Sequence, residues 1–431
     1  MPLNKVIRDG DNQDLTEERL KSTFDTDEMA AIIWEGKERV RRRREITKKV
    51  NEHTELHDPY SQAFMTRHEE IENAARKITK MVSQLDEFGI KPTDVEDMVH
   101  LTSEVIGVYG HPLALHHVMF IPALQAQCAD DQMHWLQLAL SRQIIGTYAQ
   151  TELGHGKFLA QALTTAIRYS AVRRQGEILP GKGEVKILEY QTQQHRLLPQ
   201  LARAYLMKAA EAAQNGRALG TLVDYLVKPS DNHSTIDRQP DHGYSAHLKA
   251  FDKAAKLQVK KAYERMRSLR GQGLSKEDAW NANAVELNRA ARVHTRQYIA
   301  HKFHEYVHSL ASGPCREVLF DLLHLHLNYE LLDMAYYLLE DGYLSGQQMD
   351  YMKEDMYRLL EKLRPNAVSL VDSWDISDHE LRSVLGRRDG HVYENLYKWA
   401  QESELNRTQV LPTFEKYLKP MMKNAREQSK L

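Results

Sequence analysis

Apolar and polar residues alternate with the period of an α-helix over most of the chain. Apolar residues recur every three or four positions in residues 25–50, 61–85, 130–150, 246–273 and 280–311. Residues 315–342 are apolar on several faces, which predicts a helix that is buried between its neighbours. Almost no run has the strict alternation of a β-strand bounded by turn residues. The pattern therefore predicts an all-α fold made of helical bundles.

Residues 25–50 also carry the end signals of a helix. Asp25 or Thr26 is a candidate N-cap, acidic residues follow in the first turn, and basic residues stand at the end. The basic run "ERVRRRREITKK" at 38–49 would cover most of a helix circumference with arginine. We interpret it as a solvated or partner-facing segment, in preference to a nucleic-acid patch.

Composition narrows the class of protein. The 431 residues carry a formal net charge of −2, so no concentrated basic face suggests nucleic-acid binding. The two cysteines, Cys128 and Cys315, are far apart in helical contexts, which is typical of free thiols in a reducing compartment. No apolar run approaches the roughly 18 residues of a membrane span.

The last three residues are Ser429, Lys430 and Leu431, and they follow a polar stretch. A terminal Ser-Lys-Leu is the address that the peroxisomal import receptor reads. The first residues, "MPLNKVIRDGDNQDL", have no apolar core of the kind found in a secretory signal peptide. We therefore expect the protein in the peroxisome, with the import receptor among its partners.

Spacing alone suggests little chemistry. His301, His304 and His308 share one helical face and could ligate a metal ion, but the H-E-x-x-H order is absent. We favour ordinary histidines of an amphipathic helix and predict no metal site. The chain has no glycine-rich phosphate loop, no G-x-S-x-G motif and no cysteine pair for zinc.

Five longer stretches resemble the peroxisomal acyl-CoA oxidases in the order of that family. They are "TFDTDEMAAIIWEGKERVRRRREI" (23–46), "QIIGTYAQTELGHG" (143–156), "RYSAVRRQGEI" (168–178), "LEYQTQQHRLLPQLARAY" (188–205) and "SVLGRRDGHVYENLYKWA" (383–400). The resemblance covers nearly the entire chain. It implies FAD-dependent α,β-desaturation of a fatty acyl-CoA in fatty acid β-oxidation, with molecular oxygen as acceptor, giving 2-enoyl-CoA and hydrogen peroxide.

The same resemblance implies an assembly and a set of contacts. The family has a helical N-terminal domain, a central β domain and C-terminal helical regions, usually in a homodimer. By position in the family motifs, Thr151 would contact FAD, Arg174 would reach the flavin diphosphate, and Gln191 would support the same cofactor. Each also has a plain alternative, because Arg174 can be a surface arginine and Gln191 can simply pack.

The chain departs from the family at two joins. Gly156 runs nearly directly into "KFLAQALTTAIRYSAVRRQ", where the family has its whole β domain. Tyr205 runs into "LMKAAEAAQNGRALGTLVDYL", so the segment with the catalytic glutamate is missing. Glu211 lies near this join, but its context does not recommend it, and we name no catalytic residue.

These departures shape the expected organisation and function. We expect an N-terminal helical domain at 1–156, a remnant of the first C-terminal helical domain at 157–228, and a C-terminal helical domain with its targeting tail at 229–431. We expect an acyl-CoA oxidase by descent whose activity is impaired or lost. The alternative is an inactive helical partner that dimerises with a complete acyl-CoA oxidase.

Overall fold

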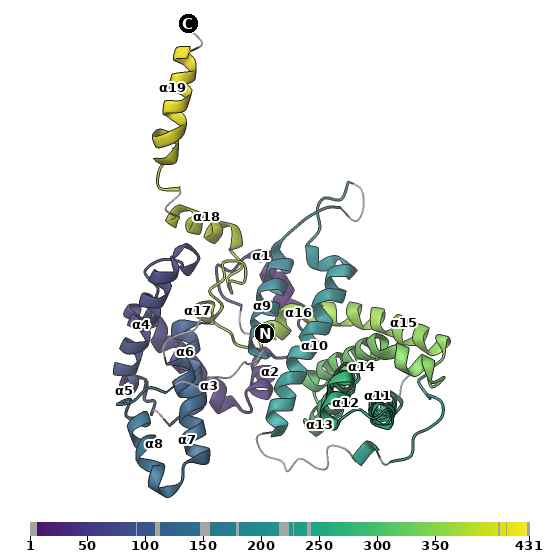
Figure 1. The fold of residues 1–431 in the computed structure, drawn as a ribbon. Helices are drawn as coiled ribbons and strands as arrows, with labels where there is room; N and C mark the ends of the chain where they lie inside the picture. The colour runs from purple at the N-terminus through teal and green to yellow at the C-terminus, as the bar shows by residue number, and fades with distance from the viewer. Residues whose placement is uncertain are drawn as a thin grey trace. The chain divides into compact units, whose positions relative to one another are not determined.

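The computed structural model describes residues 7–91, 93–107, 113–146, 156–177, 181–214, 224–226, 228–238, 243–403, 406–410 and 412–428. These residues form helices joined by turns and loops, as Figure 1 shows. Within these ranges the β-type pairing is one isolated antiparallel bridge between Arg174 and Lys186. The expected all-α fold is confirmed, and the described residues contain no sheet.

The chain divides into two compact units that interleave along the sequence. Unit 1 comprises Met1–Val40 and Leu153–Ile376, and unit 2 comprises Arg41–Glu152 and Ser377–Leu431. This division follows contacts in space, whereas the three expected domains are consecutive stretches of sequence. The three-domain division stays a prediction.

Unit 1 holds most of the long helices of Figure 1. Its elements are α1 (Gln13–Leu20), α2 (Thr26–Ile33), the start of α3 (Lys37–Glu52), α9 (Gly156–Val172), η5 (Ile187–Glu189), α10 (Gln191–Gln214), η6 (Asp224–Leu226), α11 (Ser245–Gly271), α12 (Lys276–Ala282), α13 (Ala284–Ser309), α14 (Pro314–Glu340), α15 (Gly346–Leu363), η7 (Arg364–Asn366) and α16 (Ala367–Asp372).

Helix α14 is the centre of unit 1. It begins with Pro314 in its first turn, where the missing N–H group costs no helical hydrogen bond. Helices α10, α11, α13 and α15 all pack against it. Leu322, Leu323 and Leu325 point in different directions around the helix and are each fully buried. Burial of each such leucine contributes about 1.5–3 kcal/mol, and the predicted burial between neighbours is confirmed.

Unit 2 is built from shorter helices. Its elements are most of α3, η1 (Thr54–Leu56), η2 (Gln62–Phe64), α4 (Arg67–Ser83), α5 (Leu85–Phe88), α6 (Val95–Ile106), η3 (His116–Phe120), α7 (Ile121–Gln127), η4 (Asp130–Gln132), α8 (Met133–Leu140), α17 (Asp378–Leu381), α18 (Val392–Glu402), η9 (Phe414–Leu418) and α19 (Lys419–Gln428).

The core of unit 2 joins α3, α4 and α6. Thr66 and Glu69 form a capping box that begins α4 and fixes which residues face inwards. Ile46, Ile78 and Leu101, one from each of these helices, belong to the same buried cluster. The C-terminal part of the unit reaches this body through α17, which packs against α6.

Three predicted helices end sooner than the apolar pattern suggests. The segment 25–50 forms two helices, because Glu35 and Gly36 have φ of 59° and 144° and break the chain between α2 and α3. Asp25, one of the two proposed residues, is the N-cap of α2. Asn283 separates α12 from α13, and helix α8 covers only part of 130–150. Among the described helices, none has the length and apolar character needed to cross a bilayer.

Candidate functional site

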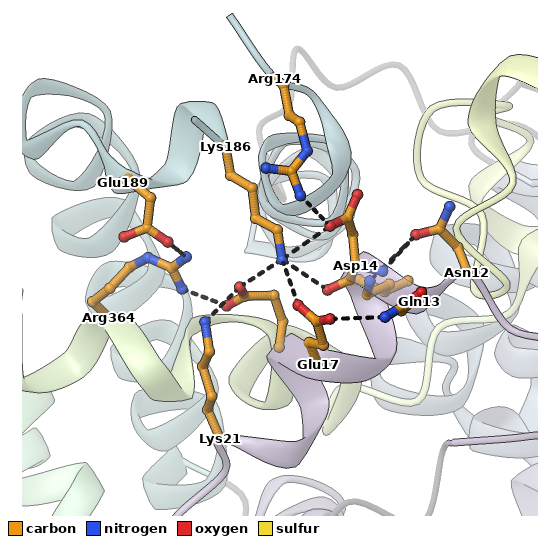
Figure 2. A network of polar contacts seen from close by, with 11 residues as sticks. Asn12, Gln13, Asp14, Glu17, Lys21, Arg174, Lys186, Glu189 and Arg364 are labelled. Atoms are coloured by element: carbon orange, nitrogen blue, oxygen red, sulfur yellow. Dashed lines mark hydrogen bonds and ion pairs between the residues drawn. The ribbon is translucent and has the colours of Figure 1, made fainter. Parts of the chain in front are cut away.

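Helix α1 presents a row of acidic side chains within unit 1. The side chain of Asn12 caps the helix by accepting hydrogen bonds from the backbone N–H groups of Asp14 and Leu15, at 3.0 and 3.4 Å. Leu15 is fully buried and anchors the helix. Asp14 and Glu17 point towards Lys186, as Figure 2 shows.

Two basic residues near these acids lie side by side. Arg174 follows α9 and forms the isolated antiparallel bridge with Lys186, so the two residues are held next to each other on antiparallel backbone segments. The Nη2 atom of Arg174 lies 2.5 Å from Oδ1 of Asp14, and Nζ of Lys186 lies 3.4 Å from the same oxygen. Asp14 therefore sits where two cations converge, as Figure 2 shows.

The rest of the network is nearly buried. The Nζ atom of Lys186 also lies 3.2 Å from Oε1 of Glu18, and Arg364 Nη1 lies 2.6 Å from Oε2 of Glu18. The second Nη atom of Arg364 pairs with Glu189 at 2.5 Å. Burial raises the pKa of Glu18, but the contacts with Arg364 and Lys21 outweigh it and lower the pKa to about 2.

A second buried acid of unit 1 lies beside α1. Asp372 accepts hydrogen bonds from Nε of Arg19 at 2.8 Å and from Nη2 of Arg168 at 2.9 Å. Burial raises the pKa of Asp372, but the two arginines outweigh this effect and lower it to about 2. Glu330 on α14 is likewise paired, with Arg203 and Arg296 at 2.5 and 3.1 Å.

These pairings limit the acid–base chemistry of unit 1. A general base works best when its pKa lies near the working pH and the atom that accepts the proton can reach the substrate. Glu18, Glu330 and Asp372 are buried and paired with arginine or lysine, so they are structural acids. Glu211 lies in α10, but its side chain is outside the described residues.

The structure places the sequence-predicted cofactor residues as follows. Arg174 has a half-exposed side chain, with an exposed fraction of 47%, and is paired with Asp14. Gln191 is the first residue of α10, and its side chain is exposed. Thr151 and the targeting residues Ser429, Lys430 and Leu431 lie outside the described residues. The roles of all these residues stay predictions.

The fit of Arg174 to a phosphate group can be judged from its surroundings. A guanidinium has five N–H donors in a planar fork, so Arg174 can serve Asp14 and a phosphate together. The carboxylate of Asp14 is nevertheless a competing anion on the same cation. The described residues thus offer a partial fit to the diphosphate of FAD.

The histidine face of α13 does not gather into a metal site. His301 Nε2 lies 2.9 Å from Oδ1 of Asp252, while the rings of His304 and His308 are 4.0 Å apart. Among the described residues, the group with ligand atoms close enough for one metal ion is His100, Glu104 and Glu380 in unit 2.

Neither of two cavities in the described part of the chain is lined by a lysine or arginine that could hold the phosphates of an acyl-CoA. One in unit 1 has a volume of about 410 Å³ and is lined by residues 233–237 and the turn between α14 and α15, with no lysine or arginine among the lining residues. One in unit 2, between α6 and α7, has a volume of about 140 Å³. Pockets for drug-sized ligands usually hold about 300–1,000 Å³.

Three family models together match almost the whole chain. Residues 25–145 match the family model described as acyl-coenzyme A oxidase N-terminal. Residues 145–281 match the C-alpha1 domain of acyl-CoA oxidase, and residues 244–423 match the acyl-CoA oxidase model. The acyl-coenzyme A oxidase acox-1.1 of Caenorhabditis elegans is 36% identical over all of both chains.

The chain belongs to the acyl-CoA oxidase family. Its resemblance to that family, stated from five sequence stretches, is confirmed. A solved structure of acyl-CoA oxidase-2 from Caenorhabditis elegans, bound with FAD, ascaroside-CoA and ATP, matches with a TM-score of 0.88 and 34% identity, over 98% of this chain and 99% of that one. Peroxisomal acyl-coenzyme A oxidase 1 of Cavia porcellus is 24% identical over 95% of this chain and 99% of that protein.

The chain is shorter than the relatives it matches, and the missing length falls inside the alignment. The alignment with the Caenorhabditis elegans enzyme runs over 673 positions and includes both ends of each protein, whereas the chain has 431 residues. More than a third of the aligned positions therefore have no residue here. This agrees with the two joins read from the sequence and with the absence of a sheet from the described residues.

Sequence reasoning missed the ion network in which Arg174 takes part. Asp14, Glu18 and Lys186 were not singled out, although "DNQDLTEER" carries a clear acidic pattern at a capped helix start. The signal for an acidic helix was available. The signal for its contact with residues 174–186 was not, because that contact joins distant parts of the chain.

Proposed function

We propose that this chain serves peroxisomal fatty acid β-oxidation as an acyl-CoA oxidase whose own oxidation of fatty acyl-CoA is impaired. Family membership supports the reaction class, and the acyl-CoA bound to a solved relative supports the substrate class. The observation that carries the impairment is the state of the buried acids in unit 1. Among the described residues, the buried acids Glu18, Glu330 and Asp372 are each paired with a basic group, so none of these three stands ready to take the α proton.

The cofactor would be FAD, held in part by Thr151, Arg174 and Gln191. FAD supplies the acceptor for the substrate's β hydrogen when it is bound. Arg174 would hold the diphosphate by charge-assisted hydrogen bonds, and its half-exposed position on a paired backbone segment supports this role. The exposed amide of Gln191 at the start of α10 would add a hydrogen bond.

Without a positioned general base, the rate of proton abstraction from the substrate should fall by a predictable factor. Proton transfer by a positioned side chain typically contributes about 10²–10⁴ in rate. Glu18 and Asp372, with pKa values lowered to about 2, are poor proton acceptors at neutral pH.

Localisation and assembly complete the proposal. The Ser-Lys-Leu tail would bring the protein to the peroxisome through the import receptor, and relatives that carry the peroxisomal name support this. The chain would act as a homodimer or as a heterodimer with a complete acyl-CoA oxidase. In a heterodimer, Arg174 could serve the flavin of the complete subunit.

The cofactor part is tested by titrating the purified protein with FAD and following flavin fluorescence. The Arg174→Gln variant should bind FAD about tenfold more weakly, since a charge-assisted hydrogen bond is worth about 1.5–3 kcal/mol. Arg267→Gln, which removes an exposed arginine of α11, is the matched control and should bind as the wild type does. Equal affinity of all three proteins would remove Arg174 from the cofactor site.

A further inference from the structure

A buried polar cluster in unit 2 joins α6 to α17. His100 and Glu104 stand one turn apart on α6, and Glu380 comes from α17. Their exposed fractions are 3%, 1% and 1%. One nitrogen or oxygen atom from each lies within 4.8 Å of those of the other two. Two carboxyl groups are thus held close together in a place that water does not reach.

Hydroxyl groups tie this cluster to the start of α17. Thr47 donates a hydrogen bond to Oε1 of Glu104 at 2.9 Å, and Ser377 donates to Oε2 at 2.5 Å. Ser377 is also the N-cap of α17, since its Oγ accepts from the backbone N–H of Glu380 at 3.0 Å. The carboxyl group of Glu104 therefore holds the residue that begins α17.

The charges around Glu104 come from three helices. Arg43 on α3 contributes a positive charge that favours the ionised carboxylate, and Glu380 on α17 contributes a negative charge that opposes it. His100, on α6 itself, adds a positive charge only when it is protonated. A second carboxylate close to Glu104 in a buried site makes ionisation of Glu104 costly.

We propose that the carboxyl group of Glu104 keeps a proton near neutral pH, and that this protonated group fastens α17, with the C-terminal segment behind it, to α6. Burial, together with the negative charge of Glu380, raises the pKa of Glu104 to about 7. Serine and threonine hydroxyls can donate or accept, so Thr47 and Ser377 suit either protonation state.

A proton suits the site better than a metal ion. The Nε2 atom of His100 lies 3.8 Å from Oε1 of Glu104 and 3.0 Å from the backbone carbonyl oxygen of Arg43. A carbonyl oxygen only accepts, so Nε2 carries a hydrogen and donates it. The nitrogen that faces Glu104 therefore has no lone pair for a metal, and the guanidinium of Arg43 adds repulsion to any cation.

The sign of the pH dependence follows from the raised pKa. A pKa raised from 4.5 to about 7 gives a stabilising contribution that is fully present below about pH 4.5 and is lost as the pH rises through about 7. Attachment of α17 should weaken roughly tenfold between pH 6 and pH 8. Arg382, which pairs with Asp58 and donates to the carbonyl of Val105, is a second anchor, so the loosening is local to α17.

The test is hydrogen exchange of the full chain at pH 6 and pH 8. Protection of the backbone amides of Asp378–Leu381 is measured relative to the intrinsic exchange rate at each pH. Wild-type protection should fall roughly tenfold from pH 6 to pH 8, whereas Glu104→Gln should change by less than about twofold. Glu72→Gln, an exposed glutamate of α4 in the same unit, is the control and should behave as the wild type.

Other outcomes are equally decisive. If Glu104→Gln loses helix content by circular dichroism, Glu380→Gln takes its place. This variant removes a negative charge that raises the pKa of Glu104, so its protection must fall less between pH 6 and pH 8 than that of the wild type. Equal wild-type protection at both pH values would overturn the proposal. Stoichiometric metal in the purified wild type, absent from Glu104→Gln by elemental analysis, would also overturn it and assign the cluster to a cation.

Discussion

The two units treat their buried acids in opposite ways. In unit 1, Glu18 and Asp372 are each surrounded by at least two basic groups, and their pKa values are lowered to about 2. In unit 2, Glu104 faces another carboxyl group as well as Arg43, and its pKa is raised to about 7. All three residues are buried.

Burial therefore does not decide the state of a carboxyl group by itself. It raises the pKa in all three cases, and the balance of neighbouring charges determines whether that effect wins. The difference matters for the reaction of the acyl-CoA oxidase family, in which a carboxylate must accept a proton from the substrate. Glu18 and Asp372 belong to unit 1, where the predicted cofactor arginine also lies, and their lowered pKa values make them poor proton acceptors near neutral pH.

The largest loss of stability is expected when the buried ion cluster of Asp372, Arg19 and Arg168 is broken. Asp372→Asn leaves Arg19 and Arg168 without their shared carboxylate in a fully buried site. The free energy of unfolding should fall by about 3–5 kcal/mol. Urea denaturation measures it, with Asp350→Asn on the exposed face of α15 as control. A loss below about 1 kcal/mol would show that the two arginines find other partners.

Glu18→Gln should lower the free energy of unfolding by less than Asp372→Asn does. Arg364 keeps Glu189, but Lys186 and Arg364 both lose a charged partner. Hydrogen bonds to charged groups contribute about 1.5–3 kcal/mol, so the free energy of unfolding should fall by about 2 kcal/mol. Glu17→Gln removes a half-exposed acid of the same helix, 3.7 Å from Lys186, and should cost much less. Equal losses would contradict the ranking by burial.

The comparison also predicts two separate pH windows for stability. Lowered pKa values mean that Glu18 and Asp372 stabilise the fold above about pH 4.5, and that this contribution is lost as the pH falls towards 2. The raised pKa of Glu104 acts in the reverse sense, and its contribution is lost as the pH rises towards 7. Thermal unfolding of the wild type between pH 3 and pH 8 should show both losses, with the alkaline one absent in Glu104→Gln.

The smallest effect on stability is expected at the half-exposed edge of the network. Asp14→Asn weakens the pair with Arg174, and such pairs contribute about 0–1 kcal/mol. The same change should strengthen binding of inorganic pyrophosphate a few-fold, because it removes an anion that competes for Arg174 and Lys186. Isothermal titration calorimetry of both proteins checks this. Weaker binding by Asp14→Asn would show that Asp14 positions Arg174.

Local patterns predicted the helices, and tertiary contacts decided the site. The burial of α14 could be read from its apolar faces, and the position of Arg174 at the end of a helix from its motif. The break at Glu35 could not, because a glutamate with φ of 59° is uncommon. The pairing of Asp14 with Arg174, and of Glu104 with Glu380, joins residues far apart in sequence, and no periodicity encodes such pairs.

The most direct test of the account is anaerobic addition of a fatty acyl-CoA to the purified chain in the presence of FAD. Reduction of the flavin is followed by the loss of its visible absorbance. We predict that the absorbance stays unchanged, because the described acids that are buried in unit 1 are fixed in ion pairs. Rapid bleaching that depends on acyl-CoA would contradict the account and would show that this shortened chain contains a working oxidation site.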